Sequence, residues 1–247
     1  MRHSPRLIIL MFLVLGLTAC QDSGSDGDDA QAAADAAASD SARFGKEMSK
    51  KGCELLSPEL VAATFDVPAD ELRQIKIMGC AYSWEGDEQT LEAGISMIRA
   101  YGREAGAASW FATATRSRTA EEMQAEMDKV AERLDESEQL DTELKKSTAK
   151  DLLKMAGSEA VTFEDVAGVG DEARVSDDGT VYVRVDNLTF MVNAYKGPTA
   201  PPPDLQGASL EQMAAIAKEN AAQWAIESAP QRKTDGIRLA GAIVDAL

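Results

Sequence analysis

The stretch TVYVRVDNLTFMVNAY, residues 180–195, decides the fold of this chain. Every second residue from Val181 to Val185 is valine, which is the period of a strand with one face turned to a core. Asp186-Asn187 has the chemistry of a two-residue hairpin turn, and Leu188 to Tyr195 has the composition of the returning strand. We therefore predict an antiparallel hairpin here. Asn187-Leu188-Thr189 also matches a glycosylation sequon, but we interpret it as turn chemistry.

Further strands are predicted on both sides of this hairpin. Val161 to Val166 and Glu172 to Ser176 precede it, separated by Gly168-Val169-Gly170. Because a strand pattern rather than a helix follows these glycines, they indicate a tight turn and not a phosphate-binding loop. In the first half of the chain two runs alternate with the same period: Cys80, Tyr82 and Trp84, then Leu91, Ala93, Ile95 and Met97.

Helices are predicted around these strands. Ser57-Pro58 supplies an N-cap and an N1 proline for one helix. Ser209 and Gln212 form a capping-box pattern ahead of another, and a last helix is expected to carry Ile237 to Leu247. The middle of the chain, about residues 105–156, is predicted to be long, charged and helical.

Together these elements predict an α+β fold in which helices pack on an antiparallel sheet. The segments MIRAYG, residues 97–102, and MVNAYKG, residues 191–197, each end a strand pattern and lead into a helix pattern. This similarity raises the hypothesis of two pseudo-repeated strand-then-helix units. A chance similarity between two short segments is the alternative.

The charge balance excludes nucleic acid as a partner. The chain has 25 Lys and Arg, 42 Asp and Glu, and a formal net charge of −17. Removal of residues 1–19 takes away Arg2 and Arg6 and no acid, so the remaining chain carries 23 minus 42, or −19. Such an acidic surface repels a phosphate backbone.

The residue inventory also argues against most catalytic chemistry. The one histidine, His3, lies within the first 19 residues, so the remainder has no histidine for a Ser-His-Asp triad, a Cys-His pair or a zinc site. The sequence has neither a Walker A loop nor a GxGxxG motif. We expect no catalytic residue, no metal and no cofactor, although a mechanism that uses carboxylates alone stays open because acids are abundant.

Residues 1–20, MRHSPRLIILMFLVLGLTAC, have the pattern of a secretion signal. Arg2 and Arg6 precede an apolar run from Leu7 to Leu17, which is shorter than the about 20 residues that a membrane-spanning helix needs. Leu17-Thr18-Ala19-Cys20 resembles a bacterial lipobox. The resemblance implies that Cys20 carries lipid and becomes the first residue of the mature chain, attached to a membrane. An ordinary signal peptide cut elsewhere is the alternative.

The residue after Cys20 bears on the compartment. In lipoproteins sorted between two membranes, an aspartate at this position marks retention at the inner membrane, whereas here it is Gln21. The resemblance therefore implies a location in the cell envelope, at the outer membrane and facing the periplasm. The outer face of a plasma membrane is the alternative.

Residues 20–43 are predicted to be a disordered acidic tether between the lipid anchor and a single domain at 44–247. The tether consists mainly of Asp, Ala, Ser and Gly and has no aromatic residue. As a flexible coil its 23 residues after Cys20 would span roughly 25 to 30 Å. The aspartates of DSGSDGDDA suggest calcium, but the ligand order of an EF-hand is missing, so a solvated charge run is the preferred interpretation.

Cys53 and Cys80 are the remaining cysteines and are expected to form a disulfide in an oxidising compartment. Closing this loop would stabilise the fold by about 3.5 kcal/mol. A redox-active or metal-binding pair is the alternative, but it lacks the CxxC spacing and a histidine partner. Because Cys80 and Trp84 share a strand face, the helix after Cys53 is expected to lie over that face, with Trp84 in the core.

Three segments resemble small bacterial lipoproteins in domain families of unknown function. They are CELLSPELV at residues 53–61, the strand with Cys80 and Trp84, and GVGDEA at residues 168–173. The charged middle, Thr119 to Gly157, departs from this compact pattern. The shared motifs are structural, so the resemblance implies no enzymatic residues.

The sequence thus predicts a non-catalytic envelope lipoprotein that binds another envelope component or a small apolar ligand. The competing class is a carboxylate-dependent hydrolase of cell-wall polysaccharide. A methionine-rich stripe on a charged helix suits an adaptable partner face, with packing inside the protein as the alternative, and the sheet around Tyr182 and Arg184 is a second candidate surface. The residues of the stripe are Met123, Met127, Val130 and Leu134.

Overall fold

The computed structural model describes residues 42–75, 79–136, 146–149, 159–203, 205, 207 and 209–247. The predicted signal sequence, Cys20 and nearly all of the predicted tether lie outside these residues. The chain divides into two compact units, of which one consists of Ala38–Ser117 and Val161–Leu247, and the other contains Arg118–Ala160. The boundary falls inside the predicted helical middle. No helix in the described segments is long and apolar enough to cross a membrane.

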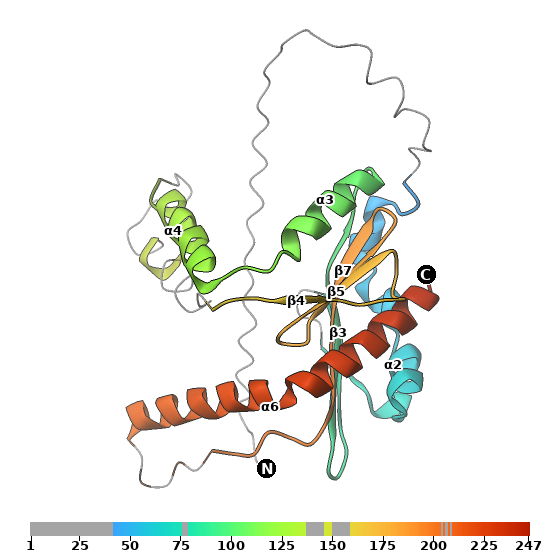
Figure 1. The fold of residues 1–247 in the computed structure, drawn as a ribbon. Coiled ribbons are helices and arrows are strands. Elements are labelled where there is room, and N and C mark those ends of the chain that lie inside the picture. The colour runs from blue at the N-terminus through green and yellow to red at the C-terminus, as the bar shows by residue number, and fades with distance from the viewer. Residues whose placement is uncertain are drawn as a thin grey trace. The chain divides into compact units, whose positions relative to one another are not determined.

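The first unit has the predicted α+β fold, with helices on an antiparallel sheet (Figure 1). One sheet has the strand order β1-β2-β3-β7-β6-β5-β4. Pairing of β3 with β7 joins the strands of the two halves of the chain. The bounds are β1 Arg73–Ile75, β2 Gly79–Glu85, β3 Thr90–Ala100, β4 Phe163–Asp165, β5 Glu172–Ser176, β6 Val181–Val185 and β7 Leu188–Gly197. The hypothesis of a pseudo-repeat stays a prediction.

The hairpin predicted at residues 180–195 is confirmed as β6 and β7, with Val185 opposite Leu188. Asp186 takes the left-handed conformation, with φ of 55°, that the tight turn requires. Asn187 is fully buried, so the sequon is inaccessible in the folded chain. The glycine turn at 168–170 is also confirmed. Gly170 has φ of 60°, and a Cβ there would lie 2.6 Å from the carbonyl oxygen of Arg184.

Helices pack on the sheet, and two of them begin at the N-caps that the sequence predicts. Ser57 Oγ accepts a hydrogen bond from the Leu60 amide at the start of α2, and Ser209 and Gln212 form the predicted capping box of α6. In this unit the helices are η1 Lys46–Lys50, α1 Gly52–Leu55, α2 Pro58–Phe65, η2 Ala69–Glu71, α3 Glu104–Ala114 and α6 Leu210–Asp245. In the other unit, α4 spans Ala120–Glu136 and begins at a Thr119–Glu122 capping box.

The two helices expected near the C-terminus are a single helix, so that prediction was wrong. α6 has 36 residues and continues through Pro230. Proline removes one backbone donor, but Pro230 is exposed, so water can reach the carbonyl that loses its partner.

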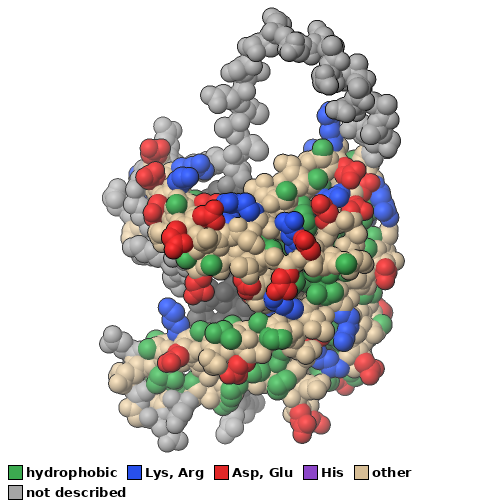
Figure 2. Space-filling view, in the orientation of Figure 1, with side chains coloured by type: hydrophobic (Ala, Val, Ile, Leu, Met, Phe, Trp, Pro, Cys, Tyr) green, Lys and Arg blue, Asp and Glu red, His purple; other side chains and the backbone are tan. Residues whose placement is uncertain are grey.

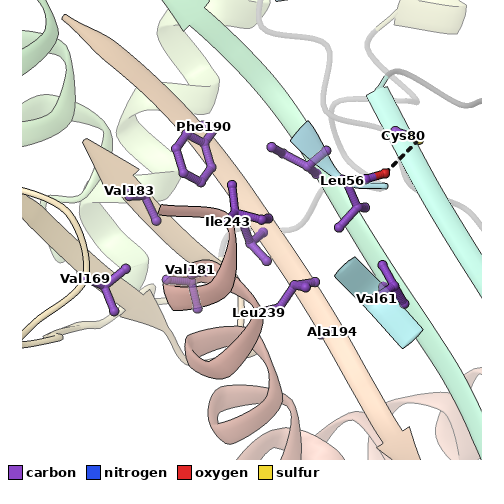
Figure 3. Packing of buried hydrophobic residues seen from close by; sticks show 14 of the residues in the cluster. Leu56, Val61, Cys80, Val169, Val181, Val183, Phe190, Ala194, Leu239 and Ile243 are labelled. Carbon is purple, nitrogen blue, oxygen red and sulfur yellow. Dashed lines mark hydrogen bonds between the residues drawn. The ribbon is translucent and has the colours of Figure 1, made fainter. Parts of the chain in front are cut away.

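The core lies on one face of the sheet, which we call the packed face (Figure 3). Cys80, Ile95, Val192 and Val181 form one row across β2, β3, β7 and β6 on this face. Leu239 and Ile243 of α6 and Val61 of α2 belong to the same cluster of buried side chains.

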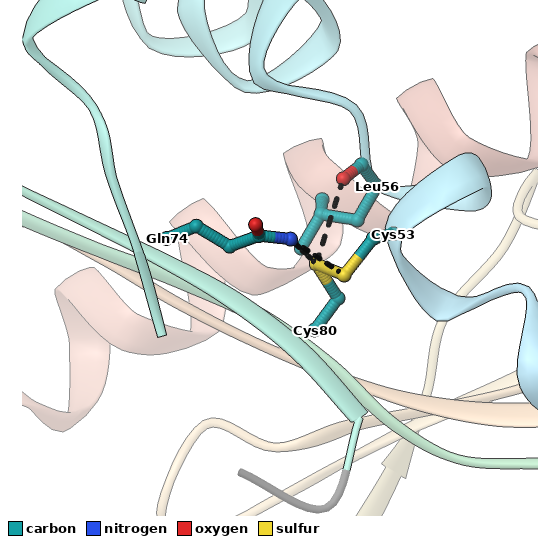
Figure 4. The surroundings of a disulfide bond; sticks show 4 residues. All are labelled: Cys53, Leu56, Gln74 and Cys80. Carbon is teal, nitrogen blue, oxygen red and sulfur yellow. Dashed lines mark hydrogen bonds between the residues drawn. A yellow bond between two sulfur atoms is a disulfide. The ribbon is translucent and has the colours of Figure 1, made fainter. Parts of the chain in front are cut away.

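The predicted disulfide between Cys53 and Cys80 is confirmed (Figure 4). Gly52 lets α1 approach the sheet closely, because a Cβ at this residue would lie only 3.2 Å from Cδ1 of Ile98 on β3. The helix predicted after Cys53 is α2, and its Val61 and Phe65 lie in the same core cluster as Cys80, as predicted. Trp84 is partly buried against the core, and its Nε1 donates a hydrogen bond to Glu71.

Candidate functional site

The second face of the sheet holds the alternate residues of each strand, and α3 covers one part of it. Arg174 of β5 shows this contact, because its guanidinium lies over the Phe111 ring and its Nη1 donates to the Thr115 carbonyl. α3 also packs against β6 and β7, and Thr189 is fully buried.

Arg184, one of the predicted surface residues, lies in this covered part. Its side chain is only 10% exposed and binds Glu172 at 2.7 Å, Glu104 at 3.0 Å and Asp171 at 3.4 Å. Burial alone would lower the pKa of Arg184, but the hydrogen bonds and negative charges of these carboxylates outweigh it and raise the pKa. Arg184 therefore links α3 to the sheet and is not free to bind a partner.

The Arg184 cluster also bears on the hydrolase alternative. A glycosidase needs two carboxylates that converge on a substrate. In this cluster Glu104, Asp171 and Glu172 converge on an arginine, and their oxygens are engaged by its N–H groups. Among the described residues, no group of Cys, Asp or Glu side chains is arranged to hold a metal ion.

The described helices of this unit leave the rest of the second face uncovered, and we call it the open sheet face. Two rows define its floor: Ala81 opposite Gly94 opposite Asn193, and Gly79 opposite Ser96 opposite Met191. Within these rows Ala81, Gly94, Ser96, Met191 and Asn193 are half-exposed. Ser83 is half-exposed beside them, and its cross-strand partner Glu92 is exposed. The floor is thus built mainly from small side chains on β2 and β3, with one carboxylate.

Two aromatic pairs border the open sheet face. Tyr195, opposite Glu92, meets Trp224 edge to face with ring centroids 6.0 Å apart. Phe163 and Tyr182 meet in the same way at 5.3 Å. Tyr182, the second predicted surface residue, is half-exposed and lies on β6 opposite Met191, at the edge of the floor.

α6 reaches this face because it crosses the sheet where β6 ends. β7 continues past its last partner on β6, Val181, and Asp235 Oδ2 of α6 accepts the Lys196 amide there at 2.7 Å. A Cβ on Gly236 would lie 2.9 Å from the Gly179 carbonyl oxygen, so the helix passes close to the β5–β6 turn. The C-terminal half of α6 lies on the packed face, and Trp224 contacts Tyr195 of the second face.

The N-terminal half of α6 presents hydrophobic side chains at its surface (Figure 2). Ile226 is 70% exposed, and Ala217, Ala221 and Ala225 are also exposed. Trp224 is half-buried against Tyr195. Because residues two apart lie on nearly opposite sides of a helix, Ile226 points away from this contact, and Trp224 is the apolar residue that borders the open sheet face.

The predicted partner stripe lies on α4, in the other unit. Met123, Met127 and Leu134 are half-buried, and Val130 is 40% exposed. These values fit neither a fully packed core nor a fully exposed surface. The stripe therefore stays a prediction.

A cavity of about 460 Å³ lies beside the disulfide. Its lining includes Lys50, Cys53, Glu54, Gly79 and Ile98, which come from two distant parts of the chain.

Comparison of the chain with protein-family models, with curated proteins and with solved structures finds no match.

The open sheet face and the cavity were both missed from the sequence. The pattern of β2 and β3 was interpreted only for its buried residues, although the intervening positions carried a signal of their own. Those positions are Ala81, Ser83, Gly94 and Ser96, which are smaller than the side chains usual on a solvated strand face. The cavity has no local signal, because packing of η1 and α1 on β2 and β3 brings its parts together.

Proposed function

We propose that this chain is a lipid-anchored envelope protein that binds another envelope protein at the open sheet face. The lipobox and Cys20 support the anchor, and the contrast between the two faces of the sheet supports the binding surface. The packed face is filled with large apolar side chains, whereas the floor of the open sheet face is small, polar and half-exposed.

Gly94 is the residue that distinguishes this floor from an ordinary solvated sheet. A glycine weakens a strand interior, and it often marks a place where another backbone or a ligand approaches closely. Packing within the sheet does not require it, since a Cβ on Gly94 would lie 3.4 Å from the Ala81 Cβ, an ordinary contact. The space that a side chain at Gly94 would fill is therefore available to a partner.

The charges and aromatic rings around the floor favour a partner segment of a particular composition. Glu92 is exposed at the floor, and the chain without its leader carries a net charge of −19 (23 minus 42). Trp224 adds apolar surface at one border. A segment with small or apolar side chains and a basic residue opposite Glu92 fits this arrangement best.

The test uses a photo-crosslinking amino acid at Ser83, in cells that make the full chain. We expect a crosslink to a second protein, and we expect Gly94→Leu to abolish it, because the leucine fills the floor. Ser109→Arg on the exposed side of α3 is the matched control and should leave the crosslink intact. A crosslink that survives Gly94→Leu, or none at all at Ser83, would contradict the proposal.

A further inference from the structure

The two cysteines of the disulfide differ in exposure. Cys80 is 1% exposed and lies on the packed face of β2. Cys53 is half-buried in the short helix α1 and lines the cavity of about 460 Å³. A reagent in the cavity can therefore approach Cys53, whereas the core shields Cys80.

Gln74 of β1 places an N–H group against both sulfurs (Figure 4). Its Nε2 lies 2.8 Å from Cys53 Sγ and 3.4 Å from Cys80 Sγ. A donor at this position stabilises negative charge on whichever sulfur becomes a thiolate. The carbonyl oxygen of Leu56, 4.0 Å from Cys80 Sγ, can accept from the thiol once Cys80 is reduced.

The cavity also carries a positive charge. Lys50 lines it, is exposed, and has no ion-pair partner within the described part of the chain. Glu54, the acidic residue of the lining, is paired with Lys51 at 3.1 Å. Because Glu54 is paired with Lys51, the positive charge of Lys50 favours the approach of a thiolate to Cys53.

We propose that Cys53 Sγ is the atom through which this bridge exchanges with the dithiol of a thiol–disulfide oxidoreductase, and that Gln74 is a positioning residue for the exchange. One thiolate of the dithiol attacks Cys53 Sγ and forms a mixed disulfide. The bond to Cys80 breaks, and Cys80 Sγ leaves as a thiolate that accepts from Gln74 and then takes a proton from water.

The second thiol of the dithiol completes the reaction. Its thiolate attacks the sulfur of the dithiol that is bound to Cys53, and Cys53 leaves as a thiolate that is then protonated. The dithiol is oxidised to a disulfide, and the two cysteines are reduced by two electrons. The reverse sequence, which begins with the Cys53 thiolate and an oxidised partner, forms the bridge. This inference does not depend on the open sheet face or on the lipid.

The site of attack can be measured directly with glutathione, which has one thiol and stops at the mixed disulfide. The chain from residue 20 onward, with Cys20→Ser to leave two cysteines, is treated briefly with glutathione, quenched with acid and alkylated. We expect mass spectrometry to find glutathione on Cys53 and the alkyl group on Cys80. Glutathione on Cys80, or equally on both cysteines, would overturn the proposal.

Two variants test the roles of the neighbours. Lys50→Gln should slow the attack by anionic glutathione about threefold at low salt and less at high salt, because an unscreened charge is lost. Lys218→Gln, which removes an exposed lysine from α6, is the matched control and should change nothing.

Gln74→Leu should slow the exchange and also raise the pH at which Cys53 of the reduced chain reacts with iodoacetamide, since the thiolate loses its donor. A purely structural role for Gln74 would not move this pH profile. The proposal is overturned if neither Lys50→Gln nor Gln74→Leu changes the exchange rate or the pH profile. The bridge would then exchange only when the chain unfolds.

Discussion

The side chain of Asn187 pairs with the main chain of Phe44, although 143 residues separate them. Asn187 Oδ1 accepts the Phe44 amide at 2.9 Å, and Asn187 Nδ2 donates to the Phe44 carbonyl at 2.8 Å and to the Tyr101 carbonyl at 2.6 Å. The side-chain amide of Asn187 thus makes the hydrogen bonds with Phe44 that a neighbouring strand would otherwise make. It fixes the first buried residue of the folded domain to the β6–β7 hairpin.

We expect Asn187→Ala to lower the free energy of unfolding by about 2 to 4 kcal/mol. The change leaves the buried Phe44 amide and two carbonyls without their partner, and each unsatisfied group costs about 1 to 3 kcal/mol unless water enters. Urea denaturation measures the loss. Asn220→Ala, which removes one hydrogen bond to the Pro201 carbonyl at an exposed site, is the control and should cost less than about 1 kcal/mol. Equal losses in the two variants would contradict this role of Asn187.

The disulfide should behave as one thermodynamic unit. We expect Cys53→Ser and Cys80→Ser each to lower the free energy of unfolding by about 2 to 5 kcal/mol. The double variant should be no worse than the less stable single one, because both residues act through the same bond. Additive losses from the two single variants would show that packing of Cys80 in the core, rather than the bridge, dominates.

Stability should fall at alkaline pH through Tyr82. Burial raises the pKa of Tyr82 above its ordinary value, and the negative charge of Glu59 raises it further. A phenol with a higher pKa in the folded chain contributes stability below the unfolded pKa of about 10 and loses it as the pH rises through the folded pKa. We therefore expect Tyr82→Phe to show a smaller loss of unfolding free energy above about pH 10 than the parent chain. Parallel slopes in urea denaturation across this range would contradict the assignment.

The strands and caps were predictable because each depends on a local pattern. The alternation in β6 and β7, the Ser57 cap and the Ser209 capping box are all set by neighbours in sequence, and the disulfide follows from two cysteines left in an oxidising compartment. The crossing of α6 past the end of β6 was not predictable, since it depends on β7 being longer than β6. The continuity of α6 through Pro230 was not predicted either, because the sequence pattern was interpreted as two separate helices. The small residues between the buried ones of β2 and β3 were a usable signal for the open sheet face, but which part of that face the helices leave uncovered depends on tertiary packing.

The anchor is predicted to depend on Cys20 alone. We expect Cys20→Ser to abolish incorporation of a labelled fatty acid and to leave a precursor that keeps its first 19 residues. Metabolic labelling followed by intact-mass measurement checks both outcomes. Cys53→Ser, which leaves the lipobox intact, is the control and should stay labelled. Label that persists in the Cys20→Ser chain would assign the leader to an ordinary signal peptide cut elsewhere.

The stripe on α4 is predicted to take part in partner capture. Val130 is 40% exposed, whereas the other three residues of the stripe are half-buried. Val130→Gln should therefore change the free energy of unfolding by less than about 0.5 kcal/mol. If the stripe binds, the same variant weakens capture of the partner in crosslinking pull-downs, because a polar amide replaces apolar contact area.

Ala125→Gln is the matched control for this test, since Ala125 is exposed on α4 outside the stripe and the change adds the same amide. It should leave both capture and stability unchanged. A loss of about 2 kcal/mol or more in Val130→Gln would instead place the stripe inside the unit, as expected for truncation of a packed side chain. Unchanged capture in Val130→Gln, together with loss of capture in Gly94→Leu, would assign partner binding to the open sheet face alone.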